Sequence, residues 1–137
     1  MEKKVKYSLV VIIILGLAFS YWFFFLKIEK CETFECFKKN LINCKRTTFQ
    51  REENFVYKYK IIGEKKDECV VEVKILFTGG DPKLNTLLNK KMTCSLPLNY
   101  FTLPEKEIKY CTGPLKEEAQ YLLIRDAYTY LSQNLGK

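Results

Sequence analysis

Hydrophobic and polar positions follow two different patterns along the chain. From Tyr7 to Leu26 no charged residue occurs, whereas from residue 33 onward apolar positions recur at intervals typical of strands and helices. An uncharged run of about 20 residues, as a helix, spans about 30 Å, the thickness of one hydrocarbon core. The pattern predicts a transmembrane anchor over residues 7–26, a linker over 27–32 and one folded domain over 33–137.

The charges on either side of the apolar run predict its orientation. Lys3, Lys4 and Lys6 precede it, whereas Lys27 and Lys30, offset by Glu29, follow it. Because positive charge favours the cytoplasmic side, residues 1–6 are expected in the cytoplasm and the C-terminal domain outside it. The expected location is the cell membrane, crossed once.

Two other readings of the apolar run remain open. Ala18 and Ser20 fit a signal-peptidase site after Ser20, but cleavage there would leave an exposed Tyr-Trp-Phe-Phe-Phe-Leu end. A pilin-like N-terminus is the other alternative, although the glycine-containing signal expected before such a segment is missing.

Periodic segments predict the core of the outer domain. Thr33 can cap a helix over Phe34–Cys44. Strands are expected over Asn54–Ile62 and Cys69–Thr78, where apolar residues alternate. An antiparallel register with Ile61 opposite Val71 keeps the apolar sets on one face. The same register pairs Lys60 with Glu72.

Weaker signals complete the fold. A final helix is expected after Pro114, with a core-facing stripe of Leu115, Ala119, Leu122, Leu123, Ala127, Tyr130 and Leu131. The other expected elements are strands over Arg46–Arg51, Met92–Leu96 and Glu107–Cys111. A short helix is expected to begin at Pro82, with Asp81 as its N-cap. The sequence therefore predicts an α+β domain, an antiparallel sheet of four or five strands packed with an N-terminal and a C-terminal helix.

Six cysteines follow the apolar run, which predicts disulfides: Cys31, Cys36, Cys44, Cys69, Cys94 and Cys111. Cys36 and Cys44 would lie about 12 Å apart on one helix, too far to bond. Cys69 and Cys94 are favoured as a cross-link within the sheet. The other four would tie the N-terminal arm and first helix to the start of the last helix. Six cysteines allow fifteen connectivities, and the sequence alone does not choose among them. A redox or metal site is disfavoured, because Cys-x-x-Cys and histidine are both absent.

Charge and composition limit the chemistry. The net charge of +7 is spread widely, which is typical of a solvated surface and compatible with an anionic membrane or polymer. Nucleic-acid binding is not expected, since no known module is visible. Adjacent acidic pairs are attributed to solvated turns and helix starts: Glu52–Glu53, Asp67–Glu68 and Glu117–Glu118. No catalytic residue, cofactor or metal ligand is predicted.

A second apolar stripe on the last helix is the candidate partner surface: Tyr121, Ile124 and Tyr128. Tyr is enriched at protein interfaces, so the stripe suggests a contact with a partner. The simpler alternative is that the helix is buried on most of its circumference.

One spacing pattern resembles a known kind of domain. It comprises Glu35-Cys36-Phe37 with Asn43-Cys44, Tyr59-x-Ile61-x-Gly63 with Asp67-x-Cys69-x-Val71, and Met92-Thr93-Cys94-x-Leu96-Pro97. Together these resemble an uncharacterised Cys-rich outer domain of short, membrane-anchored hypothetical proteins of archaea. The resemblance implies a disulfide framework and brings no activity.

The expected function is a non-enzymatic, membrane-tethered extracytoplasmic binding or structural module of the cell surface. Its expected partners are the lipid bilayer, through residues 7–26, and another envelope protein or an anionic polymer. One alternative is an exported enzyme, or an accessory subunit of one, that uses carboxylates or Tyr. A pilin-like filament subunit is the third possibility.

Overall fold

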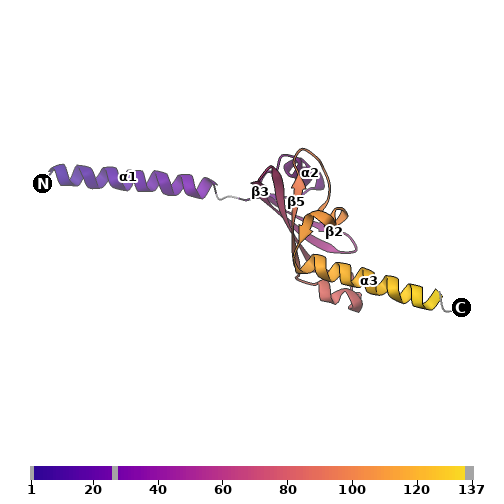
Figure 1. Ribbon diagram of the computed structural model, residues 1–137. Coiled ribbons are helices and arrows are strands. Elements are labelled where there is room, and N and C mark those ends of the chain that lie inside the picture. Colours follow the sequence, from indigo (N-terminus) through magenta and orange to yellow (C-terminus); the bar gives the residue numbers. More distant parts are fainter. Residues whose placement is uncertain (1, 26–27, 135–137) are drawn as a thin grey trace.

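The computed structural model describes residues 2–25 and 28–134 (Figure 1). In the first of these segments, side chains are described for residues 11–22. Helix α1 covers Glu2–Phe25 and so includes the predicted anchor except Leu26, which lies outside the described residues. The large apolar side chains of α1 between Val11 and Trp22 are exposed. No helix in the described part of the chain is identified as long and apolar enough for a membrane span.

A six-stranded mixed sheet forms the centre of the domain, with the strands in chain order from edge to edge. Strand β1 pairs with β2 in parallel, and the other neighbours are antiparallel. The strands are β1 Glu29–Cys31, β2 Thr47–Glu52, β3 Val56–Lys65, β4 Glu68–Phe77, β5 Lys91–Pro97 and β6 Cys111–Thr112.

The prediction of four or five antiparallel strands was therefore wrong in number and in one pairing. Strand β1 lies within residues 27–32, which were expected to be a linker. Three residues are too few to show a period of two in the sequence, so β1 is recognised only by its pairing with β2. At the opposite edge, the expected strand Glu107–Cys111 is mostly the short 3-10 helix Ile108–Tyr110, and pairing begins at Cys111.

The register of the two long strands is confirmed. Ile61 lies opposite Val71 and Lys60 opposite Glu72. The register shifts between Ile61 and Gly63, where Gly63 has a φ of +129°. This irregularity places Val70 opposite Gly63 and leaves the apolar alternation of β4 intact.

Helix α2, Phe34–Ile42, covers the core face of the sheet. The Thr33 hydroxyl accepts a hydrogen bond from the Cys36 backbone N–H at 3.3 Å, which confirms the predicted cap. The rings of Phe37, Phe49 and Tyr59 pack together, and the Phe37 centroid is 5.0 Å from each of the other two. Most of the apolar core lies on this one face of the sheet.

Three-ten helices lie in the connections that flank β5. Asp81 caps the helix Pro82–Leu87, as predicted, and its side chain accepts from the Lys83 backbone N–H at 2.9 Å. A second such helix, Pro104–Lys106, belongs to the loop between β5 and β6. Residues Thr102, Leu103 and Pro104 of this loop are buried.

Helix α3, Pro114–Asn134, packs on the sheet through its first half only. Leu115 and Leu122 are buried and Ala119 is half-buried. The rest of the predicted core stripe, namely Leu123, Ala127, Tyr130 and Leu131, is exposed. The prediction was wrong for these residues because α3 runs beyond the sheet, as Figure 1 shows at its C-terminal end.

Candidate functional site

All six cysteines form disulfides, and the pairs are Cys31–Cys36, Cys44–Cys69 and Cys94–Cys111. The favoured Cys69–Cys94 bond was wrong. Both residues point into the core, but Cys69 lies opposite Leu96 and Cys94 opposite Val71, two residues apart in register. Such diagonal neighbours are about 7–8 Å apart, beyond the reach of a disulfide. Cys94 instead bonds its direct cross-strand neighbour, Cys111.

The prediction that Cys36 and Cys44 do not bond each other is confirmed. Helix α2 ends at Ile42, and Cys44 follows with a φ of +47°. This turn brings Cys44 to Cys69, with a Cα separation of 5.5 Å. A further expectation was therefore wrong, namely that the N-terminal arm and first helix are tied to the start of the last helix by Cys31, Cys36, Cys44 and Cys111.

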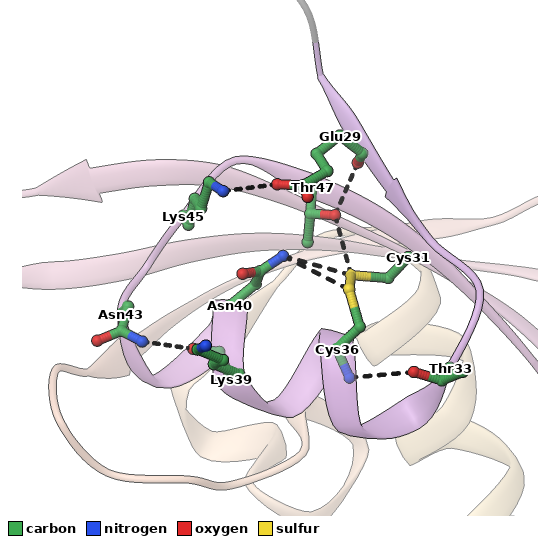
Figure 2. The surroundings of a disulfide bond; sticks show 9 residues. All are labelled: Glu29, Cys31, Thr33, Cys36, Lys39, Asn40, Asn43, Lys45 and Thr47. Atoms are coloured by element: carbon green, nitrogen blue, oxygen red, sulfur yellow. Dashed lines mark hydrogen bonds and ion pairs between the residues drawn. A yellow bond between two sulfur atoms is a disulfide. The ribbon is translucent and has the colours of Figure 1, made fainter.

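Polar side chains surround the Cys31–Cys36 bond, as Figure 2 shows. The Asn40 side-chain amide donates to Cys31 Sγ at 3.3 Å, and the Thr47 hydroxyl lies 3.4 Å from the same sulfur. Thr47 also donates to the Glu29 backbone carbonyl at 2.7 Å. Because Asn40 and Thr47 are buried, these contacts satisfy polar groups in the core and tie β1 to α2 and β2.

The distal half of α3, residues 121–131, carries six of the twelve exposed large apolar side chains found over residues 28–134. Tyr121, Ile124 and Tyr128 are 62%, 70% and 75% exposed. Leu123, Tyr130 and Leu131 are exposed beside them. The candidate partner surface predicted from the sequence is thus on the protein surface, and the alternative of a mostly buried helix was wrong.

The apolar face of α3 changes direction along the helix. At about 100° per residue, Leu115 and Leu122 lie on one side of the helix. The centre of four distal residues lies about 150° away from them, namely Tyr121, Ile124, Tyr128 and Leu131. Beyond Leu122, the side in line with the core carries Arg125, Asp126 and Thr129. If the whole of α3 packed on the sheet, this side would be apolar along its full length. The sequence therefore encodes two apolar faces, one for the core and one directed elsewhere.

The distal apolar residues also have the spacing of a helix-packing seam. Tyr121, Ile124, Tyr128 and Leu131 are separated by three, four and three residues. This is the alternation of the a and d positions in a heptad, which line the contact between two packed helices. None of these four residues is charged. Arg125 and Asp126, towards the other side of the helix, pair with each other at 3.3 Å.

The fold also assembles a partly buried polar cluster that was not predicted from the sequence. The Tyr59 hydroxyl donates to Glu105 Oε1 at 2.8 Å, and Arg51 contacts the same oxygen at 3.3 Å. Burial, and then the charge of Glu105, raises the pKa of Tyr59 far above its ordinary value. Burial likewise raises the pKa of Tyr57. The cluster holds the loop of residues 98–110 on the sheet, and no sequence signal joins residues so far apart in the chain.

The acidic pairs do not converge into a site. In the first pair, Glu52 accepts a hydrogen bond from Gln50 at 2.8 Å, whereas Glu53 pairs with Arg51 at 2.6 Å. Glu118 pairs instead with Lys90 at 2.6 Å, and the contact lowers the pKa of Glu118. Within residues 2–25 and 28–134, no group of three metal-ligating side chains comes together.

Comparisons with known proteins find no relative to guide the interpretation. No family model matches the chain, and no curated protein or solved structure is significantly similar to it. The resemblance to archaeal membrane-anchored domains stays a prediction.

Proposed function

We propose that this protein is a membrane-tethered, extracytoplasmic binding module that docks an apolar helix of another envelope protein on the distal face of α3. The observation that carries the proposal is the exposure of Tyr121, Ile124 and Tyr128 on one side of a helix that leaves the sheet. Exposed apolar patches of this kind mark interaction sites on soluble domains.

Two features support the tether and the compartment. The uncharged run over residues 7–26 has the length of a bilayer core, and the lysines before it favour an N-terminus in the cytoplasm. Three disulfides then follow the run. Stable disulfides are typical of oxidising compartments outside the cytoplasm, which supports a domain on the outer side.

The spacing and chemistry of the face support a helix as the partner. A three-four-three seam accepts side chains from a second helix between its own. Tyr supplies large contact areas with a polar end, which suits a partner that binds from water. None of the four seam residues is charged, so an apolar partner helix could pack on them without burying a charge.

Photo-crosslinking in native membranes tests the proposal. A photoreactive residue replaces Tyr128, and the matched control carries it at Gln133, an exposed position on the side of α3 opposite the seam. We expect adducts with a helix of another envelope protein from position 128 and few from position 133. Adducts only with lipid, only with a second copy, or equally from both positions would contradict the proposal.

A charge on the face gives a second readout. Ile124→Lys is expected to abolish the adduct formed at position 128, whereas Thr129→Lys, on the polar side, is expected to leave it. Both side chains are exposed, so each substitution should change the free energy of unfolding by no more than about 0.5 kcal/mol. An unchanged adduct in Ile124→Lys would rule out docking on this face.

A further inference from the structure

The sheet face opposite the core carries an unusual concentration of lysines. Strand alternation places them there, because their neighbours Cys31, Tyr59, Ile61, Val73, Ile75 and Met92 are buried on the core face. The lysines are Lys30, Lys58, Lys60, Lys74 and Lys91, which we call the lysine face. Four of them line a shallow hollow together with Ile28, Thr48 and Glu72.

Three of these lysines lie side by side across the sheet. Lys58 on β3 is directly opposite Lys74 on β4, and Lys74 is directly opposite Lys91 on β5. Neighbouring strands are about 4.8 Å apart, so the Cα atoms of the three lysines span about 10 Å. Like charges placed directly opposite one another destabilise a sheet. The fold therefore keeps an arrangement that weakens it.

The carboxylate that lines the hollow, Glu72, pairs with only one lysine of the row. Glu72 lies opposite Lys60, but its nearest cation is Lys91 at 3.3 Å. Within the described part of the chain, Lys58, Lys60 and Lys74 form no ion pair. Elsewhere on the domain lysines do pair, as Lys45 does with Glu29 at 2.7 Å.

Protection of a sheet edge does not explain the row either. Lysines on edge strands prevent unwanted strand pairing, but β3 and β4 are the two central strands of six. General solubility requires scattered charge and not three lysines in register. A row of cations in a hollow is, in contrast, the arrangement that binds an anion with several charged groups.

We propose that the lysine face binds a linear polyanion, a polymer whose repeating units carry phosphate or carboxylate groups. The row crosses three strands, so one small anion could contact only part of it, whereas a chain laid across the sheet would meet all three lysines and Lys60. This site is separate from the distal face of α3 and does not depend on the docking proposed there.

Binding of long-chain inorganic polyphosphate to the full-length chain in a neutral detergent tests the site. The double variant Lys58→Gln/Lys74→Gln is compared with Lys39→Gln/Lys106→Gln, which removes the same charge from exposed positions on α2 and on the loop after β5. We expect about a tenfold loss of affinity at low salt in the first variant only. The slope of log affinity against log salt should also fall by about one for each lysine removed.

Two results of this experiment would overturn the proposal. Equal losses in the two variants would mean that the polymer responds to net charge and not to the face. Orthophosphate that competes as well as polyphosphate at equal total phosphate would mean that the site takes a small anion. Poly-glutamate, used in the same way, distinguishes carboxylate from phosphate as the preferred group.

A charge reversal separates binding from folding. Lys74→Glu places a carboxylate between Lys58 and Lys91, so it should raise the urea midpoint of unfolding while abolishing polyphosphate binding. A fall in the midpoint would show that the row does not strain the sheet and would remove the basis of the proposal. Binding that survives the reversal would also contradict it.

Discussion

The Tyr59 hydroxyl donates a 2.8 Å hydrogen bond to Glu105, which joins β3 to a loop 46 residues further along the chain. Tyr59 is fully buried, and its ring packs against Phe37 in the centre of the core. One side chain therefore anchors the aromatic core and the loop over it at the same time.

Loss of the Tyr59 hydroxyl should destabilise the domain. We expect Tyr59→Phe to lower the free energy of unfolding by about 1.5–3 kcal/mol, because the hydrogen bond is made to a charged, mostly buried carboxylate. Tyr57→Phe is the matched control, since no hydrogen bond of its hydroxyl is found among the described residues. Urea unfolding measures both, and equal losses in the two variants would contradict the role of Glu105.

The raised pKa of Tyr59 predicts a loss of stability in alkali. A group whose pKa is higher in the folded state stabilises the fold fully below its unfolded pKa, here about 10, and less as the pH rises above it. The advantage of the wild-type chain over Tyr59→Phe in urea unfolding should therefore be constant up to about pH 9 and shrink from about pH 10 upward. A difference that grows with pH would refute the burial of the hydroxyl.

Two adjacent glycines after β4 should differ in their tolerance of alanine. Gly79 and Gly80 have φ values of +66° and +82°, but a Cβ at Gly79 would lie 2.9 Å from the Asn54 carbonyl oxygen, whereas none of the surrounding atoms lies within 4 Å at Gly80. Gly80→Ala should cost about 1 kcal/mol from backbone strain alone, and Gly79→Ala about 2–3 kcal/mol. Thermal unfolding of the two variants measures the difference, and an equal cost would show that Asn54 moves aside freely.

The disulfide that closes the longer loop should contribute more to stability. Cys44–Cys69 spans 25 residues and Cys31–Cys36 spans five. In the chain-entropy model, replacing the first pair by alanines should cost about 3.5 kcal/mol and the second pair about 2 kcal/mol. Chemical unfolding under non-reducing conditions compares them. The reverse order would indicate that the contacts of Asn40 with the short bridge matter more than the loop length.

The sequence by itself determined the elements whose signal is local. Alternation of apolar residues gave strands β3 and β4 and their register, because a shift of one residue would turn every apolar side chain to solvent. Thr33 and Asp81 marked helix starts, because each caps backbone groups within three residues of itself. The presence of six cysteines and the absence of histidine, which limit the possible chemistry, are also read directly from the sequence.

Only the tertiary structure decided what depends on neighbours distant in the chain. Cys94 bonds Cys111 and not Cys69 because the lateral order and register of β4, β5 and β6 place Cys111 directly beside it. The three-residue strand β1 exists through its pairing with β2. Periodicity shows that a helix has an apolar face but not whether the sheet is long enough to cover it. For that reason the distal half of α3, expected in part as core, is instead the surface on which the proposed function rests.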